Sequence, residues 1–180
     1  MEYDILISGF GGQGALFAGQ LLAYAAMDAG WHVTWMPSYG PEMRGGTAHC
    51  TVIISDEEIG APLVRSPRAV IALNNPSLEK YEPLVAPGGT LAYNAPLAAR
   101  APARTDIDVL AVPGSEVAAE LGDERLLNMV MLGALAAHTG VLPPEALERA
   151  LEAHIPPHRR DLLELDRAAL RRGAAYAAPA

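Results

Sequence analysis

The chain has 180 residues, of which 51% are apolar, with 21 acidic side chains, 13 basic side chains, one cysteine and a net charge of −8. A chain of this length buries roughly 70% of the surface that its unfolded state exposes, so we expect one domain over residues 1–180. A single cysteine excludes an internal disulfide, a four-cysteine iron–sulfur cluster and a multi-cysteine zinc site. The acidic excess argues against nucleic acid or an anionic membrane as the main partner.

The stretch from Ile5 to Met27 carries no charge and is long enough to be tested as a membrane span. Gly9, Gly11, Gly12 and Gly14 and two glutamines interrupt it, and Glu2 and Asp4 stand where a signal peptide carries positive charge. We therefore expect a soluble cytoplasmic protein with an intact N-terminus and no membrane span.

The first third of the chain has the pattern of a strand, a helix and a second strand. Residues 3–8 form a short apolar run before a glycine cluster, and residues 15–29 are rich in Ala and Leu. In residues 31–36, polar and apolar side chains alternate before Pro37. This order predicts a βαβ unit. Residues 37–46 contain two prolines and three glycines and are predicted to be a loop.

Strands are predicted further along the chain at residues 47–55, 69–73, 90–93 and 107–112, with a short helix at 77–81. The C-terminal third predicts helices at 115–121, 124–139, 144–153 and 161–175, separated by prolines and Gly140. Alternating strands and helices predict an α/β fold. We expect a Rossmann-like, mainly parallel sheet flanked by helices, with a helical C-terminal third.

A candidate anion-binding loop lies between the first predicted strand and helix. Its residues are Gly9, Gly11, Gly12, Gln13 and Gly14, and they include a G-x-G-x-x-G pattern. A helix N-terminus in this position offers free N–H groups to an anion. A dinucleotide site also needs an acidic residue about twenty positions on, but residues 34–37 are Thr-Trp-Met-Pro, which disfavours NAD. The alternative is that the glycines only allow close packing of the first helix.

Arg44 is the first basic side chain of the chain. Backbone amides must therefore hold any anion at the glycine loop unless Arg44 folds back toward it. The alternative for Arg44 is an ion pair with Glu42.

Two pairs of side chains suggest a site but do not predict one. His49 and Cys50 are adjacent on a predicted strand and point to opposite faces, so Cys50 is expected to be a small core residue. His154 and His158 have the spacing of a helical metal pair, but two prolines between them break the helix, and we expect no metal.

Other patterns point away from catalysis by this chain alone. Asn74-Asn75 has no preceding Gly-Asp-Gly and so does not predict a thiamine diphosphate site, and a G-x-S-x-G motif is absent from the sequence. Arginines at 159–172 alternate with acidic residues, which is typical of a solvated or interface helix face.

Two motifs together carry a family resemblance. Residues 9–14, Gly-Phe-Gly-Gly-Gln-Gly, and residues 38–46, Ser-Tyr-Gly-Pro-Glu-Met-Arg-Gly-Gly, resemble the gamma subunit of the 2-oxoacid:ferredoxin oxidoreductases. The resemblance continues through residues 54–56, 72–74 and 128–134 and through His158, Gly173 and Tyr176, so it covers nearly the whole chain. The second motif is most similar to 2-oxoglutarate oxidoreductases. Pyruvate and branched-chain enzymes have related loops, and indolepyruvate enzymes carry the same domain with a more altered loop. Asn75 departs from the glutamine of many members.

The resemblance implies alpha and beta partner subunits and, in many members, a small ferredoxin-like delta subunit. The implied complex decarboxylates a 2-oxoacid, here 2-oxoglutarate to succinyl-CoA, with thiamine diphosphate, iron–sulfur clusters, coenzyme A and ferredoxin as electron acceptor. Thiamine diphosphate and the clusters lie mainly on other subunits of that family, so none is assigned firmly to this chain.

A second candidate site follows from the resemblance. Residues Tyr39, Gly40, Glu42, Arg44, Gly45 and Gly46 are expected to line a subunit interface near the active site, where Arg44 and the glycine-loop amides favour an anionic group, such as one of coenzyme A. Two other interpretations stay open: a stand-alone nucleotide-binding or regulatory α/β module, and a purely structural subunit. Self-association of the isolated chain is a further alternative.

Overall fold

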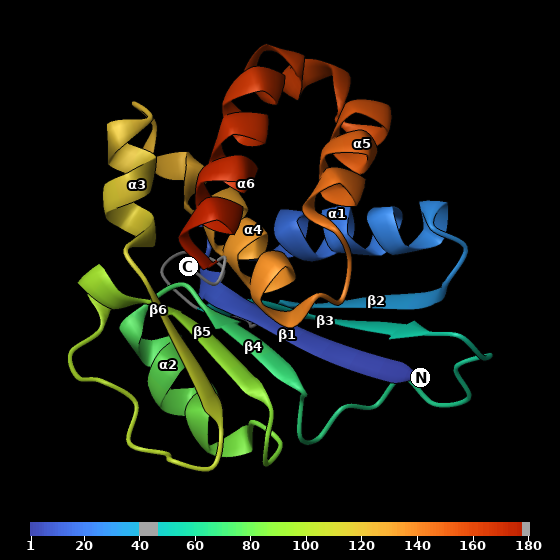
Figure 1. Ribbon diagram of the computed structural model, residues 1–180, viewed down its shortest axis with the longest axis vertical. Coiled ribbons are helices and arrows are strands. Elements are labelled where there is room, and N and C mark those ends of the chain that lie inside the picture. Colours follow the sequence, from blue (N-terminus) through green and yellow to red (C-terminus); the bar gives the residue numbers. More distant parts are fainter. Residues whose placement is uncertain (40–46, 178–180) are drawn as a thin grey trace.

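The computed structural model describes residues 1–39 and 47–177 and has a mainly parallel six-stranded sheet at its centre (Figure 1). The strand order is β2-β3-β1-β4-β5-β6. Strands β1, β4, β5 and β6 are parallel to one another, whereas β3 is antiparallel to both β1 and β2. The strands span Glu2–Phe10 (β1), His32–Tyr39 (β2), Thr47–Ser55 (β3), Ala69–Ala72 (β4), Thr90–Asn94 (β5) and Asp108–Val112 (β6).

The opening of the chain differs from a simple βαβ unit because β3 lies between β1 and β2. Val52, Ile53 and Ile54 are all buried, so β3 is covered on both faces, as expected of an internal strand rather than a half-buried one. Strand β2 occupies the edge, where Pro37 lacks an N–H but removes no hydrogen bond from a central ladder. This explains why β2 continues to Tyr39 instead of ending before Pro37.

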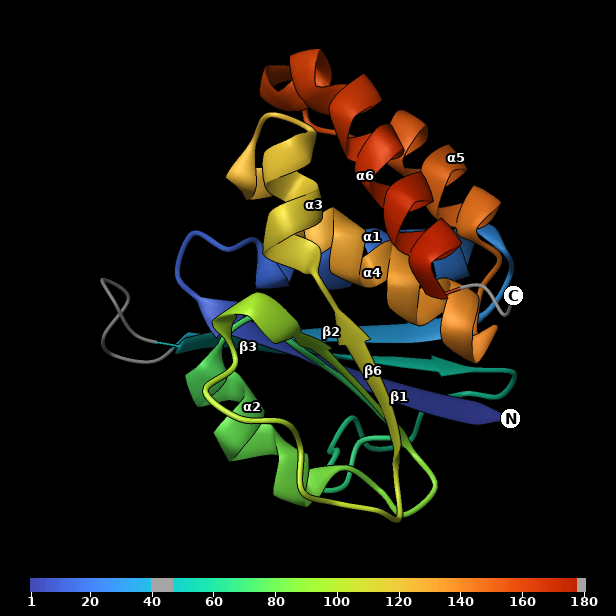
Figure 2. The ribbon, with the colours of Figure 1, turned by 60° about the vertical axis from the view of Figure 1, so that its left-hand side comes forward.

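Helices cover the two faces of the sheet unequally (Figures 1 and 2). Helices α1 and α4 pack on one face and α5 and α6 lie over them, while α2 covers the opposite face. The helical C-terminal third is therefore confirmed, although 3₁₀ turns η3 and η4 occupy the predicted starts of two helices. The helices are α1 (Ala15–Asp28), α2 (Asn75–Tyr81), α3 (Gly114–Glu120), α4 (Leu127–Thr139), α5 (Pro144–His154) and α6 (Leu163–Ala177), with η3 at Glu124–Leu126 and η4 at Pro157–Leu162.

The core has one cluster on each face of the sheet, because successive side chains of a strand point to opposite faces. Ile5 and Ile7 of β1 belong to the larger cluster, under α1 and α4. Leu6 belongs to the smaller cluster, with Leu78 of α2 and Leu91 of β5.

Helices α4 and α6 approach each other through two glycines. A Cβ at Gly133 would lie 2.1 Å from the carbonyl oxygen of Leu170, and a Cβ at Gly173 would lie 1.9 Å from the carbonyl oxygen of Val130. Any side chain at either position would force the helix backbones apart. The two glycines therefore determine how closely α6 packs against α4.

Cys50 is a core residue, as predicted. Its side chain is fully buried, and its Sγ lies 3.4 Å from the carbonyl oxygen of Ala15. Burial raises the pKa of the Cys50 thiol to about 12, so the nucleophilic thiolate is suppressed at neutral pH. Among the described residues, helices long and apolar enough to cross a membrane are absent.

Candidate functional site

The glycine loop connects β1 to α1 at the carboxyl edge of the parallel strands, on the left in Figure 2. Gly12 and Gly14 have φ angles of +93° and +79°, which residues with a Cβ rarely adopt. Gly14 is the N-cap of α1, and within the described part of the chain no side chain caps this helix. The start of α1 thus keeps the partial positive charge of a helix N-terminus, and anion binding at this loop stays a prediction.

Gln13 ties the glycine loop to the end of β4. Its Oε1 accepts a 2.7 Å hydrogen bond from the Phe10 amide and a 3.0 Å bond from Asn74 Nδ2. Asn74 in turn caps α2, since its Oδ1 accepts a 2.9 Å bond from the Ser77 amide. A Cβ at Gly9 would lie 2.8 Å from the same Gln13 oxygen. Gly9 and Gln13 therefore shape the loop, which agrees with the packing interpretation for these two residues.

Two adjoining cavities flank the loop and share Gly12 and Arg125. The first cavity, of about 360 Å³, is lined by Gly12, Gln13, Leu97, Ser115, Glu124, Arg125 and Leu127. The second cavity, of about 280 Å³, is lined by Gly12, Gly14, Arg125, Asn128, His158, Arg159 and Leu162. Both cavities lie where ligands bind in open α/β sheets, outside the carboxyl ends of the strands.

A buried amide fixes one wall of the first cavity. Asn94, at the end of β5, is 1% exposed and donates from Nδ2 to Ser115 Oγ at 2.6 Å and to the Leu73 carbonyl at 3.2 Å. Its Oδ1 accepts from the Ser115 amide at 3.1 Å. Asn94 thereby joins the ends of β4 and β5 to the start of α3 and holds Ser115 at the cavity.

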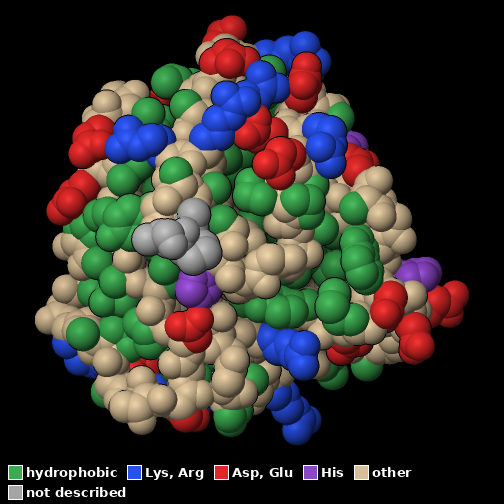
Figure 3. All heavy atoms as spheres, in the orientation of Figure 1, with side chains coloured by type: hydrophobic (Ala, Val, Ile, Leu, Met, Phe, Trp, Pro, Cys, Tyr) green, Lys and Arg blue, Asp and Glu red, His purple; other side chains and the backbone are tan. Residues whose placement is uncertain are grey.

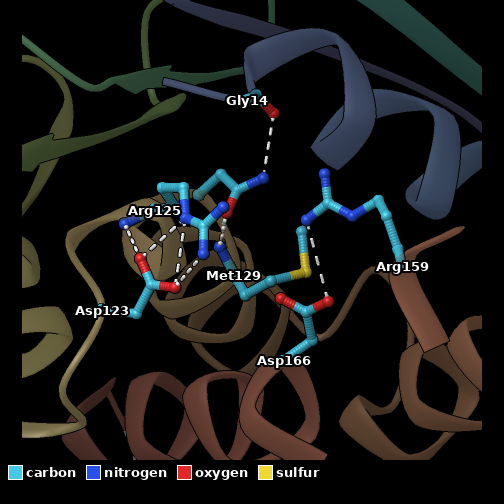
Figure 4. A network of polar contacts seen from close by, with 7 residues as sticks. Gly14, Asp123, Arg125, Met129, Arg159 and Asp166 are labelled. Carbon is cyan, nitrogen blue, oxygen red and sulfur yellow. Dashed lines mark hydrogen bonds and ion pairs between the residues drawn. The ribbon is translucent and has the colours of Figure 1, made fainter. Parts of the chain in front are cut away.

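The second cavity contains two guanidinium groups. Arg125 forms a bidentate pair with Asp123, with a shortest distance of 2.7 Å, and Arg159 lies 4.3 Å from the centre of the Phe17 ring. Asn128 is buried and donates to the Gly14 carbonyl at 3.1 Å, so α4 is attached to the glycine loop. Figure 4 shows the two arginines approaching this region from either side.

Asp166 is buried next to the Arg159 guanidinium and lies below it in Figure 4. Its side chain is 0% exposed, its Oδ2 lies 3.8 Å from Arg159 Nη2, and neither oxygen has a hydrogen-bond partner among the described residues. Burial raises the pKa of the Asp166 carboxyl to about 6, opposed by attraction to Arg159 and reinforced by Asp123. A carboxyl with this pKa changes charge near physiological pH.

The structure supplies cations to the glycine loop that sequence reasoning missed. Arg44 was the predicted cation, but Arg44 lies outside the described residues, as do the loop candidates Gly40, Glu42, Gly45 and Gly46. Arg125 and Arg159 line the second cavity instead, together with His158, although all three lie more than a hundred positions after the glycine loop in the sequence. Asn128 and His158, which also line this cavity, belong to the residues that carry the family resemblance, and these were the sequence signals for the region.

The ends of the predicted interface loop lie beside the glycine loop. Tyr39 is the last residue of β2 and pairs with Ala48 of β3, while Thr47 pairs with Phe10. Strand β2 therefore ends, and β3 begins, at the same sheet edge as the glycine loop.

The later arginines behave as the charge pattern predicts. Arg167 contacts Glu148, Glu152 and Glu164, and Arg171 pairs with Glu148 at 2.7 Å. Figure 3 shows charges of both signs interleaved over α5 and α6. Arg159 differs from them because it points to the second cavity and not to this charged face.

The donor groups of the described chain do not fit a metal or cluster site. His154 stacks on Tyr24 at 4.2 Å and lies 2.9 Å from Asp28 Oδ2, whereas His158 lines the second cavity, so the two histidines form no pair. Within the described ranges, clusters of three or more His, Cys, Asp or Glu side chains that could hold a metal are absent.

The asparagine pair does not fit a thiamine diphosphate site either. Asn74 is engaged with Gln13 and the start of α2. Asn75 accepts a 2.7 Å bond from the Ala99 amide and donates to Glu79 at 3.1 Å. Both amides therefore serve local structure.

Comparison with known proteins places this architecture in a family. Residues 4–176 match the family described as pyruvate ferredoxin/flavodoxin oxidoreductase. The 2-oxoglutarate synthase subunit KorC of Methanothermobacter marburgensis is 37% identical over 164 residues, which cover 87% of this chain and 88% of KorC. The ketoisovalerate oxidoreductase subunit VorA of Methanothermobacter thermautotrophicus is 43% identical over 136 residues, 76% of this chain, but the match spans only 28% of VorA.

A solved structure has the same fold over almost the full length of both chains. The gamma subunit of a keto/oxoacid ferredoxin oxidoreductase from Geobacter sulfurreducens superposes with a TM-score of 0.84 at 34% identity, over 97% of this chain and 98% of that chain. The family match over residues 4–176 and the shared fold of the solved gamma subunit identify the same family. The chain belongs to the pyruvate ferredoxin/flavodoxin oxidoreductase family.

Proposed function

We propose that the chain is the gamma subunit of an enzyme that oxidatively decarboxylates a 2-oxoacid to its coenzyme A thioester, with ferredoxin as electron acceptor. The observation that carries this proposal is the match to KorC and to the Geobacter sulfurreducens gamma subunit, which in each case covers most of this chain and most of the relative. The chain acts as one domain over residues 1–180 and works with alpha and beta subunits and, in the larger form, a ferredoxin-like delta subunit.

The proposed substrate is 2-oxoglutarate. KorC relatives support it because the match spans most of their length. The VorA relatives reach higher identity over about a quarter of their own length, and a PorC relative is 30% identical over 92% of its length. A branched-chain 2-oxoacid or pyruvate is therefore the alternative substrate.

The site chemistry of this chain is positioning and anion binding. The donor sets described above leave thiamine diphosphate and the iron–sulfur clusters to the partner subunits, where they would supply carbanion stabilisation and electron transfer. The glycine-loop residues Gly9, Gly11, Gly12, Gln13 and Gly14 and the Arg125 and Arg159 side chains suit a phosphate group of coenzyme A.

An exposed apolar border supports an interface at this edge of the sheet. Phe10, Met36 and Leu97 are 38%, 44% and 45% exposed; Phe10 is the last residue of β1 and Leu97 follows β5, and both strands end at this edge. Large apolar side chains next to a ligand cavity are typical of a surface that a partner covers. The predicted loop of Tyr39, Gly40, Glu42, Arg44, Gly45 and Gly46 completes the proposed interface.

Reconstitution tests the proposal. The chain is co-expressed with candidate alpha and beta subunits from the same genome, and the purified complex is assayed for dye or ferredoxin reduction with 2-oxoglutarate, pyruvate or 2-ketoisovalerate. We expect copurification and reduction that depends on both 2-oxoglutarate and coenzyme A. A chain that elutes alone and binds a nucleotide would support a stand-alone module instead.

The role of the interface loop has its own variant. Arg44→Ala in the reconstituted complex is expected to raise the KM for coenzyme A and to leave the assembly of the complex unchanged. Unchanged kinetics for both substrates would leave only a structural role for the loop.

A further inference from the structure

Strand β6 forms one open edge of the sheet. All residues of β5 beside it are buried, whereas in β6 only Val112 is buried and Val109 is 37% exposed. In Figure 2, β6 lies at the front of the sheet, and none of the described segments crosses over it. The opposite edge of the sheet is β2, which contains Pro37. Proline blunts a sheet edge, and the sequence of β6 contains none.

The segment before β6 is held away from this edge. Glu82, directly after α2, is buried, and its carboxylate accepts hydrogen bonds from the amides of Ala103 at 2.5 Å and Arg104 at 3.1 Å. The same carboxylate pairs with Arg100 at 2.9 Å. These contacts fasten residues 100–104 beside the end of α2, on one face of the sheet, so this segment does not cover the backbone of β6.

The backbone groups of β6 alternate between β5 and the open edge. The Asp108 amide donates to the Gly89 carbonyl at 2.8 Å, so the even-numbered residues of β6 direct their N–H and C=O groups to β5. Val109 and Ala111 therefore direct theirs outward, where the described part of the chain provides no further strand. Unpaired N–H and C=O groups along an apolar edge are a template for another strand.

A second β6 fits this edge through its own symmetry. In an antiparallel ribbon with a two-fold axis at Leu110, Val109 of one copy lies opposite Ala111 of the other. The outward-facing groups of the two copies then meet, and each Val–Ala pair exchanges both of its backbone hydrogen bonds. The larger valine side chain faces the smaller alanine side chain in both pairs, so the ribbon is self-complementary.

Charge and proline favour this register over its neighbours. Asp108 is the one charged residue of β6, and it pairs with His138 of its own chain at 2.5 Å. In the register described, Asp108 lies opposite Val112 of the other copy. A register shifted toward the start of the strand brings the two Asp108 carboxylates closer together, which is unfavourable. A register shifted toward its end places Val109 opposite Pro113, which has no N–H.

We propose that β6 is a self-association surface, on which a second copy of this chain adds its own β6 in antiparallel orientation, centred on Leu110, so that two sheets continue as one. The ribbon is short, and small interfaces are weak, so we expect a dimer with a Kd of roughly 10–100 µM. The inference goes beyond the proposed function, since it concerns this chain alone. In the enzyme, the same ribbon would join two gamma subunits.

Sedimentation equilibrium of the full chain, from about 5 µM to about 1 mM, measures the association. We expect mainly monomer at the lowest concentration and mainly dimer at the highest. Ala111→Pro removes an outward N–H but no bond to β5, so it should remain monomeric. Ala111→Ser keeps this N–H and should change the Kd by no more than about twofold, and circular dichroism verifies that both variants fold. A wild-type chain that stays monomeric throughout, or a folded Ala111→Pro that dimerises like wild type, would overturn the proposal.

An engineered cysteine tests the register, because Cys50, the one native cysteine, is buried. In the proposed ribbon, the two residues at position 110 form a non-hydrogen-bonded pair with Cα atoms about 4.5 Å apart, which is within disulfide range. Leu110→Cys should therefore give a disulfide-linked dimer on a non-reducing gel after mild oxidation. Val109→Cys should not, because its two copies lie about 8 Å apart. Cross-linking of Val109→Cys in preference to Leu110→Cys would overturn the register.

Failure of this inference is distinguishable from failure of the proposed function. A wild-type chain that stays monomeric but supports 2-oxoglutarate oxidation in the reconstituted complex would refute the ribbon and leave the subunit assignment intact. A chain that forms the Leu110→Cys dimer but does not copurify with the candidate alpha and beta subunits would support the ribbon and refute the proposed function.

Discussion

Replacing the buried Asp166 by asparagine should stabilise the isolated chain at neutral pH. Asparagine has nearly the shape of the protonated carboxyl but cannot ionise. The folded-state pKa of Asp166 is raised by burial from 3.8 to about 6, so the stability that the protonated carboxyl contributes is present below pH 3.8 and is lost as pH rises through 6. At pH 8 the ionised group therefore costs the folded state about 3 kcal/mol relative to its cost in the unfolded chain.

Thermal unfolding at pH 4 and pH 8 measures this cost. About 3 kcal/mol corresponds to roughly 6–12 °C in Tm for a chain of this size, so Asp166→Asn should melt higher than wild type at pH 8 and close to it at pH 4. Asp161→Asn, at an exposed position, is the control and should change Tm little at either pH. An Asp166→Asn variant that is less stable at pH 8 than at pH 4, relative to wild type, would show that attraction to Arg159 outweighs burial.

Three further predictions use glycines and the single cysteine. Gly12→Ala and Gly30→Ala introduce a side chain at similar positive φ angles with open space around them, so circular dichroism melts should show similar losses of about 1–2 kcal/mol in the free energy of unfolding. Only Gly12→Ala should weaken the binding of sulfate, used as a probe for an anion at the glycine loop. Equal sulfate binding by both variants would show that Gly12 takes no part in anion binding. Gly173→Ala should cost about 3 kcal/mol or more by urea denaturation, whereas Gly60→Ala, in open space, should be near neutral, and a tolerated Gly173→Ala would contradict the close approach of α4 and α6. Because burial raises its pKa to about 12, Cys50 should resist iodoacetamide at pH 8 in the folded chain and react once urea unfolds it; fast labelling of native protein would refute the burial.

Much of the fold could be predicted from apolar periodicity and from glycine and proline positions. The predicted strand at 47–55 has the observed bounds, and the glycine loop and first helix lie where the pattern places them. The position of β3 between β1 and β2 could not be predicted, because strand order depends on which faces are covered in three dimensions. Val52, Ile53 and Ile54 in succession were the local sign of a central strand.

The candidate site was only half predictable. Its glycine loop is contiguous in sequence and carries its own chemical rationale. Arg125 and Arg159 reach the loop through the packing of α4 and α6, and this packing depends on Gly133 and Gly173 rather than on any charge pattern. A surface arginine and a cavity arginine have the same appearance in a segment where charges of both signs alternate.

The central place of β1 also affects the order in which the sheet can be assembled. Its two neighbours, β3 and β4, come from residues 47–55 and 69–72, so β1 must wait for both, whereas β2 and β3 can pair as an antiparallel ribbon over a short connection. During synthesis from the N-terminus, the first strand has no sheet partner until the chain has grown past residue 55, and its second partner follows only after residue 72. The glycine loop at the end of β1 thus acquires its binding geometry late, after the helical third has supplied Asn128 and Arg159.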